Sequence, residues 1–283
     1  MIQRSRIAGT PLPVCLWLFT AAAAAQVPPP AAEERPIQDN SFLLEEAYNQ
    51  ERGTVQHIFA FSRMWNSREW VSTFTQEWPG LRNPRHQFSY TLIGMHAAGS
   101  EGAGLGDVAL NYRYQVAGSG DSRLAFAPRL SLLVPTGDVA QGRGSGAAGL
   151  QTNLPLSVIL SRRLVTHWNA GATFVRHAHG PGGIRASTVG YNLGQSFIFA
   201  PHPRINILLE TVANRFQSVD DAGSTPWGGT TYISPGIRWS HNLSSGLQIV
   251  PGLAIPVGIG RAGQSGVFLY LSFEGRISSI YGR

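Results

Sequence analysis

Charged and amide side chains recur at alternate positions in several segments of the chain, and these side chains are the best candidates for chemistry. The candidates are Arg113, Arg129, Arg238, Glu210, Asn111, Gln151 and Gln248. Because successive side chains of a strand face opposite sides, each would lie on the polar face of a strand whose other face is apolar. Such faces could line a watery path that favours anionic or polarisable solutes, or they could pair charges that stabilise the wall. Both interpretations remain open.

The residue types and their spacing offer little support for a catalytic or metal-binding site. Cys15 is the only cysteine and lies in an N-terminal apolar stretch, so thiol nucleophiles and thiolate metal sites are excluded elsewhere. Lipid-modifying barrel enzymes place histidine and serine two residues apart on one strand face. None of the eight histidines has that spacing, and His167 followed by Asn169 comes nearest. His177 and His179 could share a face, but no third metal ligand is evident. We therefore predict no catalytic residue, no metal and no cofactor.

The 22 basic residues are all arginine and stand against 16 acidic residues, which gives a net charge of +6. This modest excess is spread thinly along the chain, whereas a nucleic-acid-binding protein gathers its positive charge on one face. We therefore exclude nucleic acid as a partner.

Apolar side chains alternate with polar or small ones from Thr54 onward. Residues 108–116, 150–160 and 247–257 show this period of two most clearly, and it is typical of strands with one apolar and one polar face. The alternation predicts about twelve strands, near residues 54–65, 69–78, 86–95, 106–116, 123–134, 149–160, 164–176, 188–200, 204–216, 230–240, 247–257 and 266–274.

Alternation alone would also fit a soluble sandwich, but strand length and loop length favour a membrane barrel. Many segments reach about 10 residues, which a tilted strand needs to cross the hydrocarbon. Short connections at residues 161–163, 201–203 and 241–246 alternate with long ones at 136–149, 177–187 and 217–229. Short periplasmic turns opposite long external loops are typical of outer-membrane barrels. Tryptophans near the strand ends agree, because aromatic girdles flank the apolar band. We predict an all-β fold, an antiparallel transmembrane barrel over residues 54–274.

The N-terminus divides into two parts. Residues 1–25 have the composition of a cleavable secretory signal, with Arg4 and Arg6 before an apolar run and small residues at 23–25. Residues 26–53 form a separate periplasmic segment, proline-rich at first, in which Ser41 could cap one or two helical turns. This segment is either a plug that enters the barrel or a loosely ordered tail, and termini more often behave as tails.

The last predicted strand resembles the C-terminal targeting signal of outer-membrane barrels. Its pattern is Gln264, Gly266, Leu269, Leu271 and then Phe273. The resemblance implies recognition by the barrel insertion machinery. Barrels usually end on that aromatic residue, whereas here the chain continues, with residues 275–283 as a tail. An ordinary amphipathic strand would give the same pattern.

Two glycine motifs resemble those of a known family. The sequence Gly104-Leu105-Gly106-Asp107 opens one strand, and Pro135-Thr136-Gly137-Asp138 ends another before a glycine-rich loop. Together with Asn169-Ala170-Gly171 they resemble the outer-membrane channel family associated with the meta-pathway of phenol degradation, over residues 104 to 273. The resemblance implies a barrel that passes small molecules, aromatic or apolar ones among them, and it carries over no catalytic residue.

These observations predict a barrel in the outer membrane of a Gram-negative bacterium, with the surrounding lipid and small-molecule solutes as its partners. It would allow passive or facilitated uptake. Two alternatives remain: a lipid-modifying barrel enzyme, and a structural or surface barrel whose lumen is filled by side chains.

Overall fold

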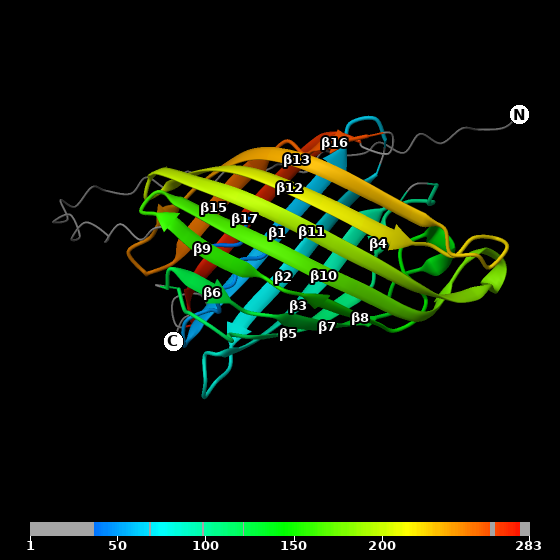
Figure 1. Ribbon diagram of the computed structural model, residues 1–283, viewed down its shortest axis with the longest axis horizontal. Helices are drawn as coiled ribbons and strands as arrows, with labels where there is room; N and C mark the ends of the chain where they lie inside the picture. Colours follow the sequence, from blue (N-terminus) through cyan, green and yellow to red (C-terminus); the bar gives the residue numbers. More distant parts are fainter. Residues whose placement is uncertain (1–36, 68, 98, 121, 261–263, 278–283) are drawn as a thin grey trace, which may run out of the picture. The chain divides into compact units, whose positions relative to one another are not determined.

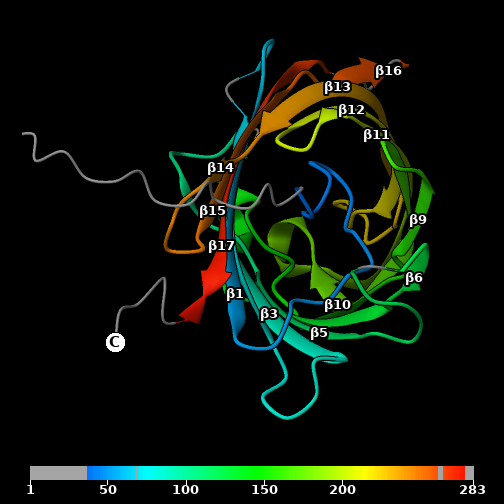
Figure 2. The same ribbon diagram turned by 90° about the vertical axis from the view of Figure 1, so that its left-hand side faces the viewer.

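Neighbouring strands pair antiparallel around a complete ring, in a computed structural model that describes residues 37–67, 69–97, 99–120, 122–260 and 264–277. The ring has 12 strands, as the alternation predicted. It closes where the first strand pairs with the last, from Thr54 opposite Arg276 to Met64 opposite Gly266. Figures 1 and 2 show the barrel from the side and along its axis. Closure leaves no unpaired edge, which a barrel in lipid requires.

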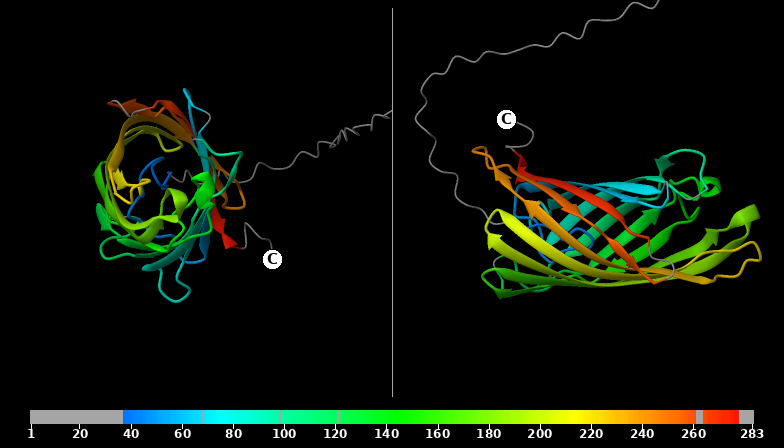
Figure 3. Two further views of the ribbon diagram at one scale, coloured as in Figure 1. Left: turned by 90° about the vertical axis from the view of Figure 1, so that its right-hand side faces the viewer. Right: turned by 90° about the horizontal axis from the view of Figure 1, so that it is seen from above.

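Eight of the strands are continuous. They are β1 (Thr54–Met64), β2 (Trp70–Pro79), β3 (His86–His96), β10 (Leu164–His179), β11 (Arg185–His202), β12 (Ile205–Gln217), β13 (Trp227–Trp239) and β17 (Gly266–Arg276). β10 and β11 continue past their predicted ends, so the connection expected at 177–187 shrinks to residues 180–184. Their hairpin projects at one end of the barrel, together with the connection between β12 and β13 (Figure 3).

The other four strands are each interrupted once. Their halves are β4 (Gly104–Leu105) with β5 (Val108–Tyr114), β6 (Leu124–Phe126) with β7 (Arg129–Val134), β8 (Gly149–Asn153) with β9 (Leu156–Ser161), and β15 (Gln248–Ala254) with β16 (Val257–Ile259). Three interruptions contain a proline, at Pro128, Pro155 and Pro256. Proline has no backbone N–H and cannot donate a hydrogen bond to the neighbouring strand, so the pairing breaks there. The short β14 (His241–Asn242) pairs with β15, and the short helices η1 (Val139–Gln141) and η2 (Pro181–Gly183) lie in connections.

The two faces of the barrel differ sharply in chemistry. The outside carries apolar side chains that pair from one strand to the next. Leu110 pairs with Leu132, Leu132 with Leu150 and Leu150 with Phe174, and all four side chains are exposed. Polar side chains line much of the inside, where Ser131, Ser157, Ser196, Glu210 and Ser234 are fully buried beside an apolar cluster that includes Leu208 and Val250. An apolar exterior around a polar interior is the reverse of a soluble protein and is expected of a barrel in lipid. Among the described residues, no helix is long and apolar enough to cross a membrane.

Residues 37–50, which we call the lumen segment, run inside the barrel (Figure 2). The helical turn expected from Ser41 is absent, since residues 41–50 have only bends. Its backbone N–H groups instead donate to side chains of the barrel wall, as the hydrogen bonds below show. A backbone group that finds such a partner has no need of helical hydrogen bonds. The predicted signal, residues 1–25, lies outside the described residues.

Candidate functional site

The wall of the barrel binds the lumen segment along its length. Five backbone N–H groups of the segment donate to side chains on different strands or their ends: Leu43 to Glu210, Glu45 to Asn169, Ala47 to Ser157, Asn49 to Gln115 and Gln50 to Gln87, at 2.7–3.0 Å. The acceptors stand on β12, β10, β9, the end of β5 and β3, so the segment follows the inner wall around the ring. The polar side chains of the lumen therefore accept the backbone hydrogen bonds of a segment that has no secondary structure of its own.

Arg113 holds the second half of the segment. Its guanidinium donates to the carbonyls of Glu46 and Tyr48, at 3.0 and 2.8 Å, and to the side-chain oxygen of Asn49 at 3.1 Å. Glu77 lies 3.7 Å away and balances the charge. Arginine suits this role because its planar fork offers five donors in fixed directions.

Arg238 holds the first half in the same way. It donates to the side-chain oxygen of Asn206 at 2.9 Å and to the carbonyls of Asp39 and Asn40. Asp39 in turn accepts hydrogen bonds from Tyr270 and Ser272 on β17. These contacts tie the start of the segment to both β13 and β17.

Arg129 forms the ion pair between wall and segment, with Nη2 2.8 Å from Oε1 of Glu45. It also donates to the side-chain oxygens of Asn111 and Gln151, at 2.9 and 3.0 Å. Gln151 continues the network to Thr173 at 3.1 Å. The predicted candidates Asn111, Arg129 and Gln151 thus form one connected cluster around Glu45.

Inward-facing glycines make room for the apolar side chains of the segment. A Cβ at Gly236 or Gly252 would lie 2.5 Å from the ring of Phe42, and one at Gly194 would meet Leu44. The Phe42 ring also packs against Phe268, with ring centroids 5.7 Å apart. Glycine in a strand often marks a close approach of another group, and this signal was in the sequence although the prediction did not use it.

The lumen segment separates two cavities. The outer chamber, of about 600 Å³, has Leu43, Leu44 and Glu45 in its lining and shares Ser145 and Thr188 with a cavity under the long loops. The inner chamber, of about 530 Å³, lies at the opposite end and includes other residues of the same segment. No lining residue is common to the outer and inner chambers.

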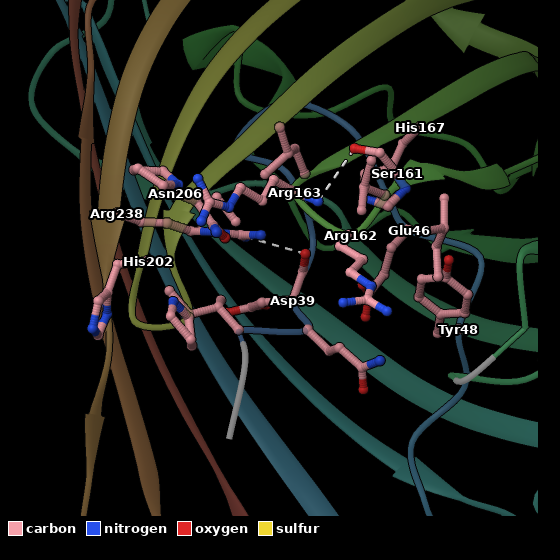
Figure 4. A pocket seen from close by; sticks show the side chains of 18 of the residues that line it. Asp39, Glu46, Tyr48, Ser161, Arg162, Arg163, His167, His202, Asn206 and Arg238 are labelled. Atoms are coloured by element: carbon pink, nitrogen blue, oxygen red, sulfur yellow. Dashed lines mark hydrogen bonds between the residues drawn. The ribbon is translucent and has the colours of Figure 1, made fainter. Parts of the chain in front are cut away.

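Figure 4 shows the inner chamber, where Arg238 and Asn206 meet Asp39. Arg162 and Arg163, from the turn between β9 and β10, stand at its rim and are exposed. Glu46 and His167 complete its deeper side. Burial raises the pKa of Glu46 well above the usual range of a carboxyl, and the neighbouring Asp39 raises it further.

The structure places all seven predicted candidates on the inner face and shows which groups they bind. Arg238 and Glu210 stand on the neighbouring strands β13 and β12, where a charge pair could have stabilised the wall, but the described residues show no ion pair between them. Arg238 instead binds Asn206 and the segment, while Glu210 accepts from Leu43. Gln248 is buried and donates to Asn242 at 2.8 Å. The prediction missed the partner that most of these side chains share, the lumen segment.

The structure also contains a serine–histidine pair whose members stand on different strands, so spacing within one strand does not reveal it. The Ser157 hydroxyl lies 2.6 Å from Nδ1 of His167, across the pairing of β9 with β10. Ser157 is fully buried and its hydroxyl also accepts the N–H of Ala47. With the segment in place, the hydroxyl is therefore engaged and covered. His177 and His179 belong to no cluster of three or more metal-ligand residues within the described part of the chain.

The chain resembles solved outer-membrane barrels in structure. No family model and no curated protein matches its sequence. An outer membrane channel from Pseudomonas putida F1 aligns with a TM-score of 0.55 and 12% identity, over 81% of this chain and 97% of its own. The NanC porin aligns with a TM-score of 0.52 and 9% identity, over 79% of this chain and 100% of its own. At these identities the likeness establishes the fold, and the link to the phenol meta-pathway family stays a prediction.

Proposed function

We propose that the chain is an outer-membrane channel for the uptake of small molecules and that its lumen segment acts as a plug. The observation that carries this proposal is the position of the segment, which lies between two cavities that open toward opposite ends of one barrel. An apolar outer face and a polar lumen support a pore in lipid. The predicted signal peptide and C-terminal strand pattern fit export and insertion into the outer membrane.

The plug is held by many polar contacts and by two apolar clusters, one that includes Phe42 and one that includes Tyr48. Wall side chains accept its N–H groups, and Arg113 and Arg238 donate to its carbonyls. A neutral bond of this kind contributes about 0.5–1.5 kcal/mol net and a bond to a charged group about 1.5–3 kcal/mol, since water can replace the partner. A segment held this way can leave the wall and be rehydrated, as a movable plug must.

A disulfide across the plug tests this proposal. The hydroxyl oxygens of Ser41 on the plug and Ser196 on β11 are 2.9 Å apart, so Ser41→Cys with Ser196→Cys places two thiols within reach of a bond. We expect proteoliposomes to swell in solute when the pair is reduced and to stop swelling when it is oxidised. Each single variant is the control, because neither can form the crosslink.

The solute panel should include phenol and toluene, which the family resemblance implies, beside sugars and small anions. Equal swelling in the oxidised and reduced states would show that passage does not require the plug to move. A barrel that passes no solute in either state would instead be the structural barrel with a filled lumen.

A further inference from the structure

The outer chamber carries a row of polar side chains that the protein itself does not satisfy. Asn192 on β11 pairs in register with Asn214 on β12, which pairs with Thr230 on β13. All three are half-buried and line the chamber. Within the described ranges, none of the three side chains has a hydrogen-bond partner. Three neighbouring strands therefore present unused donors and acceptors to one cavity.

Asn153 adds a buried acceptor to the same chamber. Its amide nitrogen donates to the side-chain oxygen of Asn169 at 2.8 Å, and this orientation is fixed because Asn169 contacts both the N–H and the carbonyl of Glu45. The side-chain oxygen of Asn153 is left without a partner in the described structure, although the residue is only 4% exposed. A buried carbonyl without a donor is costly, so a ligand that donates would be favoured there.

The remaining lining argues against a charged ligand and adds one aromatic ring. Glu45 and Arg129 neutralise each other at 2.8 Å. Arg215, the other charged residue of the lining, has outward parity and lies over the Trp227 ring, with its guanidinium carbon 6.0 Å from the ring centroid. Of the two aromatic residues of the lining, Tyr191 has outward parity and is 54% exposed, whereas Phe216 shares the inward parity of Asn214 and is 46% exposed. Tyr191 stacks on Trp227 on the barrel exterior, with centroids 5.9 Å apart. The Phe216 ring therefore stands on the inward face, where it can pack against the C–H face of a cyclic polyol, while the polar row beside it favours a solute that also forms hydrogen bonds.

We propose that the outer chamber binds a small uncharged polyol, with Asn153, Asn192, Asn214 and Thr230 as its hydrogen-bonding groups. A carboxamide offers a donor beside an acceptor, and each hydroxyl of a polyol can both donate and accept. The chamber volume of about 600 Å³ lies in the range of roughly 300–1,000 Å³ typical of small-molecule sites. The inference rests on the proposed function, because it makes this chamber the first binding site on the path.

Equilibrium dialysis with the full chain in lipid nanodiscs tests the proposal. Radiolabelled glucose and myo-inositol should bind saturably, whereas glucuronate and toluene should not. Asn214→Val with Thr230→Val should weaken polyol binding about tenfold, as expected for the loss of two hydrogen bonds. Asn192→Ala, on a different strand, should weaken it as well. The matched control is Thr211→Val, because Thr211 is on β12 but faces outward.

Polyol binding that is unchanged in both lumen variants would overturn the proposal, as would saturable binding of toluene in place of glucose. Repeating the dialysis with the oxidised Ser41→Cys and Ser196→Cys pair separates this proposal from the channel itself. Binding that persists while no variant or state passes solute would leave the site intact and reject the channel. Passage of solute without any polyol binding would reject the site alone.

Discussion

Nη2 of Arg129, on the barrel wall, lies 2.8 Å from Oε1 of Glu45, on the plug. Arg113 stands directly opposite Arg129 in the pairing of β5 with β7. Two guanidinium groups so close would repel, but each has its own carboxylate, Glu45 for Arg129 and Glu77 for Arg113. The arginines that could have lined an ionic path are thus engaged in holding the plug.

The Arg129–Glu45 pair should be energetically coupled when the plug is seated. A double-mutant cycle with Arg129→Gln and Glu45→Gln measures this, using modification of the Ser41→Cys thiol as a readout of plug release. The Ser41 side chain is buried against Ser196, so reagent reaches the thiol only after the plug moves. We expect each single change to speed modification and the double change to add little, with a coupling of about 1 kcal/mol for a partly buried pair. Additive effects would show that the pair does not hold the plug.

Gly252→Ala should loosen the plug without unfolding the barrel. The added methyl would lie 2.5 Å from Cε1 of Phe42, and an aromatic ring confined by Phe268 and Tyr270 has little room to withdraw. Planar-bilayer recordings should show a higher open fraction than in the parent protein. Gly190→Ala is the control, since its Cβ would have no contact shorter than 3.4 Å. An unchanged open fraction would mean that Phe42 does not help to keep the path closed.

The sequence predicted the barrel well because its signal is periodic and local. Alternation of apolar and polar side chains determines which residues face lipid, and Leu110 and Asn111 illustrate both faces. The partners of the inward residues are not encoded in that period. Glu210 adjoins Arg238 on the next strand, yet it binds Leu43, which lies 167 residues away in the chain. A segment without secondary structure has no periodic pattern of residues, so its contacts with the wall cannot be predicted from the sequence and are seen only in the closed barrel.

The lipid face gives a second matched pair of substitutions. Leu110 is 48% exposed on the outside of β5, while the adjacent Ala109 faces the lumen. We expect Leu110→Arg to lower the free energy of unfolding by about 2–4 kcal/mol, the cost of a guanidinium near the bilayer midplane. Ala109→Arg should cost less because lumen residues meet polar neighbours. Urea unfolding in lipid vesicles measures both, and equal losses would contradict the assignment of the two faces.

Glu46 should make plug seating depend on pH. Burial raises its pKa, as does Asp39 nearby, while Arg113 and Arg238 lower it and Glu274 raises it, with a net shift well above the ordinary value. The seated plug therefore favours the neutral carboxyl, whereas a released plug exposes a carboxyl with a pKa of about 4.3. The resulting stabilisation is complete below the ordinary pKa and is lost as pH rises through the raised one. Seating should weaken with increasing pH.

Modification of the Ser41→Cys thiol across this pH range tests the dependence on Glu46. Thiol reactivity itself rises with pH, so the informative quantity is the ratio of rates between the parent and the Glu46→Gln background. Glutamine resembles the neutral carboxyl in shape and cannot ionise, which should keep the plug seated at every pH. The ratio should therefore be near one in acid and grow as pH rises through the raised pKa. A ratio that stays constant would show that the Glu46 carboxyl does not control release of the plug.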